Sequence, residues 1–307
     1  MVRINLKEKI KKLLLLDGAM GTQLMARGIQ TGKCSDYLNI ESPDIVLDIH
    51  RSYLIAGSDA ILTNTFGANK YALARHGLAE MVEKINAAGA KIARRAAGDS
   101  KYVLGDIGPS GDFLEPLGNL KPKDLKDAFE QQAKALAAGG VDGFIIETMT
   151  ALDEITIAIE AVKSVCKLPV FASMSFDNAG GDFRTMMGVG VKDAAAKLIS
   201  LGVEAVGFNC GTVSLEEYVK LAERFAAVSG GAVILAEPNA GRPELVDEQA
   251  VYNVSPDDFA EAVEKIHKAG VNIIGGCCGT GPEHIKAVAN RLKASSRYCR
   301  QKFFSML

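Results

Sequence analysis

The sequence NIIGGCC, at residues 272–278, is the last of eight short apolar runs that decide the fold of this chain. Each run is rich in Val, Ile, Leu or Phe and lacks the polar alternation of a half-exposed strand. Continuous apolar runs of this kind are typical of strands in a parallel sheet that is buried on both faces. The other seven runs lie at residues 13–17, 60–66, 102–108, 143–149, 170–176, 205–210 and 232–238.

Segments with helical periodicity separate these runs. One begins with a capping box, in which Glu217 follows Ser214 by three residues, and the last runs from Thr280 to about Ala294. Eight β-then-α units over about 280 residues, with no linker between them, predict a closed (β/α)₈ barrel of the TIM type. An open doubly wound sheet is the alternative, although the glycine spacing at 105–111 differs from the dinucleotide-binding fingerprint.

We therefore expect a single α/β domain over residues 1–307, with its core at about 10–295 and a tail at 296–307. The chain is 48% hydrophobic and 23% charged, as expected for a globular protein with a large core. Its net charge of −2 gives no general attraction to nucleic acid or to an anionic membrane surface.

The apolar runs and the cysteines indicate the cellular compartment of the protein. The run at 13–16 is too short to span a bilayer and lacks the features of a signal peptide. We expect a cytoplasmic protein, in which the six cysteines stay reduced. They are then metal ligands or buried apolar side chains, because a disulfide framework does not suit that compartment.

Polar residues stand where the apolar runs end. In a (β/α)₈ barrel the active site lies at the carboxyl ends of the strands, so these residues are candidates for it. One polar ending is commonplace, whereas eight form a ring, and Thr65 and Asn209 are expected there as substrate contacts. The complete ring is Asp17, Asn64, Thr65, Asp106, Glu147, Asp177, Asn209, Cys210, Glu237, Asn239, Cys277 and Cys278.

The strongest chemical signal is the sequence GGCCG at 275–279. Neighbouring residues of a regular strand point to opposite faces, so Cys277 and Cys278 can share one ion only where the backbone leaves strand geometry. The flanking glycines permit that departure, and Cys210, which ends the sixth run, also precedes a glycine. Three thiolates suit zinc and leave one tetrahedral position open, as a catalytic zinc requires. The alternative is that the vicinal pair is two small buried hydrophobes.

Seven segments carry a family resemblance: LLLLDGAMGTQL (13–24), ILTNTFGAN (61–69), GDIGPSG (105–111), IIETM (145–149), GFNCG (207–211), EPNAGRP (237–243) and GGCCGTGPEHI (275–285). They resemble the homocysteine S-methyltransferase family, which includes the homocysteine-binding module of cobalamin-dependent methionine synthase and betaine–homocysteine methyltransferase. The resemblance implies a (β/α)₈ enzyme that methylates homocysteine to methionine. It also implies a zinc ion held by Cys210, Cys277 and Cys278, with the homocysteine sulfur as its fourth ligand.

The resemblance extends to the substrate site. Asp17 and Glu147 match the family carboxylates that hold the substrate ammonium, and the backbone of Gly18 and Ala19 matches the turn that receives its carboxylate. A free thiol with a pKa of ~8.5 is only a few per cent ionised at neutral pH, whereas zinc binding deprotonates it. The alternative role for both carboxylates is to cap the start of a helix.

The methyl donor is the part of the function that stays open. The PNAG and GFNCG segments are closest to the methionine synthase branch, which implies a methylcobalamin or other methylcorrinoid donor. This chain lacks the folate, cobalamin and activation modules, so the corrinoid is expected in trans or on a longer protein. S-methylmethionine and betaine are alternative donors, although the absence of Trp disfavours an aromatic cage for betaine. Another small thiol as acceptor, or a zinc subunit that docks a corrinoid protein without turnover, are the remaining alternatives.

Overall fold

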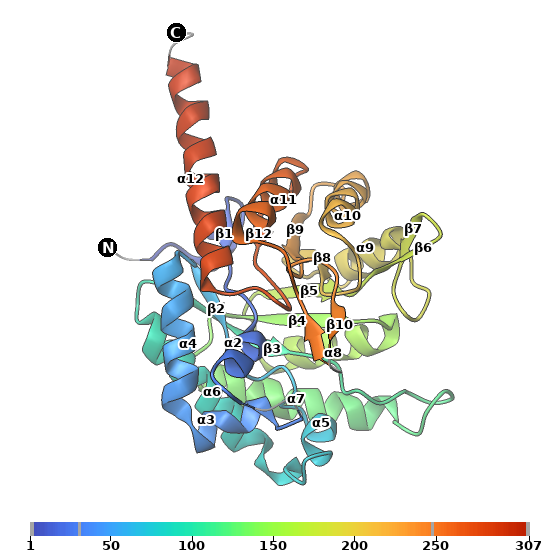
Figure 1. The fold of residues 1–307 in the computed structure, drawn as a ribbon. Coiled ribbons are helices and arrows are strands. Elements are labelled where there is room, and N and C mark those ends of the chain that lie inside the picture. Colours follow the sequence, from blue (N-terminus) through green and yellow to red (C-terminus); the bar gives the residue numbers. More distant parts are fainter. Residues whose placement is uncertain (1–2, 30–31, 247–248, 305–307) are drawn as a thin grey trace.

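The computed structural model describes residues 3–29, 32–246 and 249–304, and its centre is a barrel of eight parallel strands (Figure 1). Each strand lies within one of the eight apolar runs, so the predicted (β/α)₈ fold is confirmed. The barrel strands are β1 (Leu14–Leu15), β2 (Ala60–Leu62), β3 (Tyr102–Ile107), β4 (Gly143–Met149), β5 (Val170–Met174), β8 (Ala205–Asn209), β9 (Val233–Glu237) and β12 (Ile273–Ile274).

The barrel closes between the two ends of the chain. The strand order is β1-β12-β9-β8-β5-β4-β3-β2, and β1 pairs in parallel with β12, with Leu14 opposite Ile273. Between β1 and β2 the link is one backbone hydrogen bond, from Asp59 N to Leu15 O at 2.7 Å. Because β1 is joined to β12 on one side and to the start of β2 on the other, the sheet closes on itself and the open-sheet alternative is excluded.

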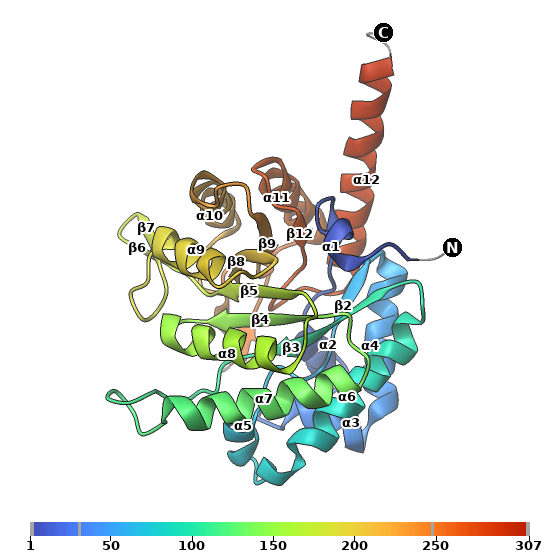
Figure 2. The ribbon, with the colours of Figure 1, turned by 180° about the vertical axis from the view of Figure 1, so that it is seen from behind.

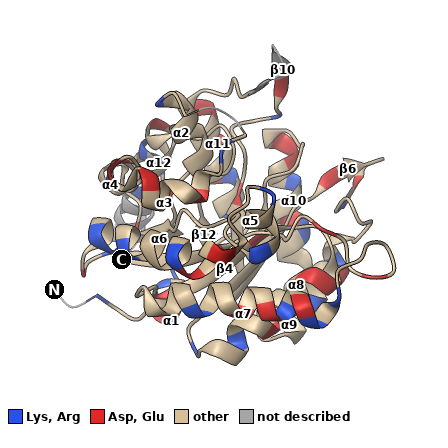
Figure 3. Ribbon diagram, turned by 90° about the horizontal axis from the view of Figure 1, so that it is seen from below, with Lys and Arg blue, Asp and Glu red and all other residues tan. Residues whose placement is uncertain are grey.

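Eight longer helices cover the outside of the barrel (Figure 2). Charged residues of both signs lie along them (Figure 3), and α10 begins with the predicted capping box of Ser214 and Glu217. No described helix is long and apolar enough to cross a membrane. The helices are α4 (Pro43–Ala56), α6 (Val82–Ala97), α7 (Pro122–Ala138), α8 (Leu152–Val165), α9 (Val191–Ser200), α10 (Leu215–Val228), α11 (Pro256–Lys268) and α12 (Pro282–Phe304).

Helix α12 differs from the expectation at its end. It continues beyond Ala294 to Phe304 and projects away from the barrel (Figure 1). The physical reason is that no Gly or Pro follows Pro282 in the sequence, so nothing in the backbone stops the helix.

Two hairpins and several short helices were not predicted. They lie outside the eight βα repeats, and each is too short to show a clear periodicity in the sequence. The hairpins pair β6 (Asp177–Ala179) with β7 (Asp182–Arg184) and β10 (Glu244–Val246) with β11 (Gln249–Val251). The short helices are α1 (Leu6–Lys9), α2 (Met20–Ala26), η1 (Ser35–Tyr37), α3 (Leu38–Glu41), α5 (Lys70–Ala74) and η2 (Ala79–Met81).

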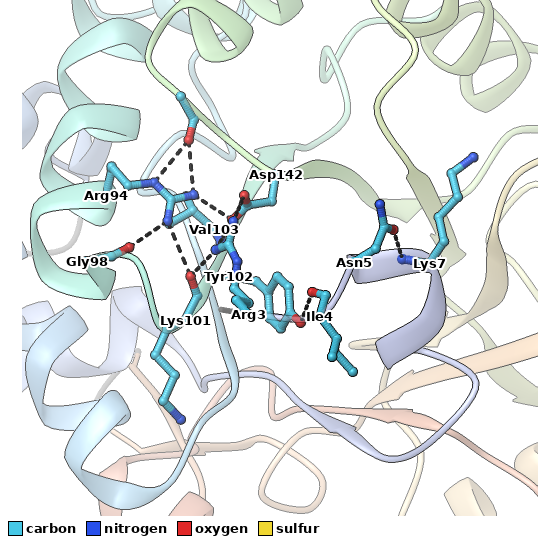
Figure 4. A network of polar contacts seen from close by, with 11 residues as sticks. Arg3, Ile4, Asn5, Lys7, Arg94, Gly98, Lys101, Tyr102, Val103 and Asp142 are labelled. Atoms are coloured by element: carbon cyan, nitrogen blue, oxygen red, sulfur yellow. Dashed lines mark hydrogen bonds and ion pairs between the residues drawn. The ribbon is translucent and has the colours of Figure 1, made fainter. Parts of the chain in front are cut away.

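The N-terminal segment covers the amino end of the barrel. Leu6 of α1 packs into the apolar cluster that fills the barrel interior. Arg3 forms an ion pair with Asp142 and lies over the ring of Tyr102, 4.6 Å from its centroid, as Figure 4 shows. The Tyr102 hydroxyl donates to the carbonyl of Ile4 at 2.6 Å. These contacts hold the amino end together, and the predicted site residues gather at the opposite, carboxyl end.

Candidate active site

Three cysteine thiols meet at the carboxyl end of the barrel. The Sγ atoms of Cys210, Cys277 and Cys278 lie within 4.8 Å of one another. Cys210 directly follows β8, and the vicinal pair follows β12. Cys34 and Cys166 are free and lie outside this group. The structure thus brings together the three cysteines that the sequence singled out.

The backbone around these cysteines leaves strand geometry, as predicted. Cys210 has a φ of +54°, in the left-handed region that few non-glycine residues adopt. Its carbonyl accepts a hydrogen bond from the Tyr218 hydroxyl at 2.6 Å, which holds this conformation. Strand β12 ends at Ile274, and Cys277 N then donates to Pro238 O at 2.9 Å. The turn places both vicinal thiols on one side.

The residues present fit a zinc ion. The three thiols hydrogen-bond to one another, and bonds from Cys210 and Cys277 lower the pKa of Cys278. The hydrogen bond with Cys210 instead raises the pKa of Cys277, so the trio retains protons that a cation would displace. Nearby, the buried Oδ1 of Asn239 has no hydrogen-bond partner among the described residues. Three sulfur donors in one tight group are the ligand set of a tetrahedral zinc site.

Four buried carboxyl groups line the same end of the barrel. Burial raises the pKa of each of them, that of Glu147 to about 8 with the Cys210 thiol adding to the effect. None of the ion pairs in the described part of the chain involves any of the four. Buried acids without a basic partner suit a cationic ligand. The four are Asp17, Asp106, Glu147 and Glu237.

Asn209 links the thiols to these acids. Its Nδ2 donates to Glu147 Oε2 at 2.9 Å and lies 3.9 Å from the Cys277 sulfur. Its Oδ1 accepts from Thr148 N at 2.8 Å and from Ser173 Oγ at 2.7 Å. All its polar atoms therefore have protein partners, and Asn209 orients Glu147. Its expected contact with the substrate stays a prediction.

The turn after β1 is closely packed. Asp17 Oδ2 accepts from Leu62 N at 3.1 Å, and Ala19 N donates to Thr280 Oγ1 at 3.1 Å. A Cβ at Gly18 would stand 2.7 Å from the same Thr280 oxygen, so only glycine fits there. Because the Ala19 N–H already has a partner, a carboxylate bound to this turn must displace Thr280 or rely on Gly18.

The Thr65 side chain is more deeply buried than we expect for a residue that contacts the substrate. Its side chain is fully buried, and its hydroxyl donates to Asp106 O at 2.8 Å and pairs with the Thr63 hydroxyl. These bonds tie the end of β2 to β3. The predicted contact between Thr65 and the substrate remains a prediction without support from these contacts.

Three residues of the site were not assigned a role from the sequence. Glu237 and Asp106 stand in the predicted ring, and their position at strand ends was the available signal. No feature of the sequence indicated Tyr252, which follows the β10–β11 hairpin. Its side chain hydrogen-bonds with Cys278, and a Cβ added to Gly279 would lie 2.3 Å from the Cβ of Tyr252. Only the folded structure brings that loop against the cysteines.

Comparison with solved structures supports the fold. The metallated form of the homocysteine methyltransferase MmuM from Escherichia coli superimposes with a TM-score of 0.76 at 23% identity, covering 91% of this chain and 96% of that one. A methyltransferase from Methanosarcina mazei gives a TM-score of 0.60 at 11% identity over 93% of this chain and 94% of that one. At these identities the likeness shows a shared barrel.

Comparison at the sequence level identifies the family. The methionine synthase of Mycobacterium tuberculosis is 33% identical over 95% of this chain, and that of Mycobacterium leprae is 33% identical over 91%. The chain spans about a quarter of the length of these two relatives, 25% and 24% respectively. The model of the family described as homocysteine S-methyltransferase matches residues 14–292. This chain therefore belongs to the homocysteine S-methyltransferase family, a family of methyl-transferring enzymes.

Proposed function

We propose that this chain transfers a methyl group to the sulfur of L-homocysteine, which gives methionine. The observation that carries the proposal is the meeting of two groups at one end of the barrel. Three thiols lie within 4.8 Å of one another, and buried acids without a basic partner stand beside them. The first group suits a thiol-binding metal, and the second suits an ammonium group.

The metal in this proposal is Zn²⁺, held by Cys210, Cys277 and Cys278. When bound, zinc keeps a substrate thiol in its thiolate form at neutral pH. Three protein ligands leave the fourth tetrahedral position for the substrate sulfur. The protein's own contribution is to fix this sulfur beside the groups that hold the rest of the amino acid.

In this proposal the ammonium and carboxylate groups of homocysteine bind to the buried acids and to the turn after β1. Asp17 and Glu147 bind the ammonium, and Asn209 keeps Glu147 in position through the hydrogen bond at 2.9 Å. The backbone of Gly18 and Ala19 receives the carboxylate. These groups act by orientation, since a methyl transfer between sulfur and a donor needs no proton from them.

The donor in this proposal is a methylcorrinoid such as methylcobalamin. The support is the 33% identity with two methionine synthases, of which this chain matches about a quarter. The corrinoid would reach the site on a separate protein or on other modules of a longer one. The reduced state that the thiol site requires is consistent with a cytoplasmic location.

A donor panel tests the proposal. Zinc-loaded protein is incubated with homocysteine and either methylcobalamin, S-methylmethionine or betaine, and methionine is measured. We expect methionine from methylcobalamin. If methionine forms only from S-methylmethionine or only from betaine, that compound is the donor and the corrinoid proposal is wrong. If no donor gives methionine, the proposed activity is contradicted. Adding homocysteine at pH 7 should also release about one proton per site, because the metal takes the thiolate.

A further inference from the structure

Glu237 occupies a place in the site that no role yet explains. It ends β9, its side chain is 2% exposed, and its carbonyl accepts from Cys210 N at 3.2 Å. A Cβ at Gly275 would lie 3.0 Å from Glu237 Cγ and Oε1, so the glycine leaves room for this carboxyl group. The side chain therefore lies inside the barrel mouth, between β9 and the segment that leads to the cysteines.

The partner of Glu237 is a second acid. Its side chain hydrogen-bonds with Glu147, and its Oε2 is buried without any partner among the described residues. Glu147 Oε2 in turn accepts from Asn209 at 2.9 Å. Two buried acids against each other, with one oxygen unused, are unfavourable for the folded chain alone. An arrangement of this kind implies an external group that completes it.

Glu154 is a buried acid of the same protein whose side chain, unlike that of Glu237, has hydrogen-bond donors. It is also buried, at 8% exposed, but its Oε1 accepts from Ser110 N at 2.8 Å and from Ser110 Oγ at 2.6 Å. A carboxylate held by two donors in this way is a structural element of a loop. Glu237 lacks such donors, so a structural role of the Glu154 kind does not account for it.

The free oxygen points to a ligand with several N–H donors. A primary ammonium carries three, and Asp17, Glu147 and Glu237 offer three carboxyl groups close enough to interact with one another. A quaternary ammonium has no N–H to give to these oxygens. The site therefore selects a primary ammonium.

We propose that Glu237 is a further substrate-binding residue, which with Glu147 forms a carboxyl pair that grips the primary ammonium of the thiol substrate. The inference rests on the proposed function and adds the basis of its selectivity. The acceptor is a thiol that carries an α-ammonium group, and thiol acids of the same length without the amine are rejected.

The test compares two ligands that differ in the amine. Calorimetry on the zinc-loaded full chain gives the Kd of L-homocysteine and of 4-mercaptobutanoic acid. Wild type should prefer homocysteine. Glu237→Gln should cut that preference about ten- to a hundredfold, because one charge-assisted hydrogen bond is lost, with zinc content unchanged. The matched control, Glu154→Gln, should keep the wild-type preference.

Each outcome separates the two proposals. If the wild type prefers homocysteine and Glu237→Gln prefers it equally, the inference fails while the proposed function stands. Equal weakening of both ligands by Glu237→Gln also overturns it, because a structural role would act on both. If the wild type itself shows no preference, the proposed substrate is wrong. Should Glu237→Gln not fold, Glu237→Asp, which withdraws the carboxyl by one methylene, must show the same selective loss.

Discussion

Asn209 and Glu147, on neighbouring parts of the barrel rim, are joined by a hydrogen bond from Nδ2 to Oε2 at 2.9 Å. The next residue after Asn209 is Cys210, whose backbone turns into the left-handed region at φ +54°. The end of β8 therefore sets the position of a proposed metal ligand, Cys210, and through Asn209 that of Glu147, which is proposed to bind the substrate ammonium. The three thiols and the buried acids are thereby linked through one strand end.

Replacing Asn209 tests this coupling. Asn209→Ala removes the donor to Glu147 Oε2, so we expect homocysteine to bind roughly tenfold more weakly, a cost of about 1.4 kcal/mol. Calorimetry on zinc-loaded protein measures it. Ser173→Ala is the control, since it deletes only a donor to Asn209 Oδ1, and it should stay within about threefold of wild type. An unchanged Kd in Asn209→Ala would show that Glu147 needs no support.

Glu147→Gln tests directly whether the Glu147 carboxyl group binds the substrate ammonium. Losing a charge-assisted hydrogen bond should cost ~1.5–3 kcal/mol, which is roughly ten- to over a hundredfold in homocysteine affinity. Zinc content, measured by elemental analysis, should stay at the wild-type value. Glu160→Gln, on the exposed face of α8, is the matched control and should bind normally. If the affinity of Glu147→Gln is unchanged, Glu147 does not hold the ammonium.

The sequence predicted the barrel because each strand is a run of apolar residues with its own local signal. The positions of Cys210, Cys277 and Cys278 followed from those runs, since strand ends share one rim. Hydrogen bonds between side chains carry no such signal. The pairing of Glu147 with Glu237 depends on how closely β4 and β9 approach across the barrel mouth, and only the folded chain fixes that.

Two further differences have the same origin. Thr65 sits at a strand end like the other candidates, yet its hydroxyl is used by Asp106 O and Thr63. Tyr252 lies in a loop without periodicity, and tertiary folding brings it over Gly279. A position at a strand end indicates nearness to the site, whereas the direction of a side chain is decided by its neighbours.

Gly279→Ala tests the turn that presents the vicinal cysteines. Gly279 has a φ of +81°, and a Cβ there would lie 2.3 Å from the Tyr252 side chain. We expect weaker zinc binding, measured by competition with a chelator, because the turn must shift. Gly28→Ala is the matched control: it has the same φ of +81° and nothing within 4 Å of its Cβ. The control should show only the strain of about 1–2 kcal/mol in stability and normal zinc affinity. Equal zinc affinity in both variants would contradict the account.

The pH dependence of stability tests a buried acid, Asp36, that lies outside the group of Cys210, Cys277 and Cys278. Burial raises the pKa of Asp36 from 3.8 to about 6. The folded state then binds more protons than the unfolded state between these values, so the free energy of unfolding falls as pH rises from about 4 to about 6. Asp36→Asn removes this loss. Relative to wild type, the variant should gain up to about 3 kcal/mol between pH 4 and pH 7 in urea unfolding. A difference that does not change with pH would refute the assignment.

Cys210, Cys277 and Cys278 are proposed to hold a zinc ion for catalysis and not for folding. The zinc content of purified protein tests this, measured by inductively coupled plasma mass spectrometry, with circular dichroism to check the fold. Wild type, Cys34→Ala and Cys166→Ala should each hold about one zinc per chain. Replacing any of the three rim cysteines by Ala should leave almost none in a folded barrel, because the core does not depend on the rim. Full zinc in a rim variant, or its loss in either control, would contradict the account.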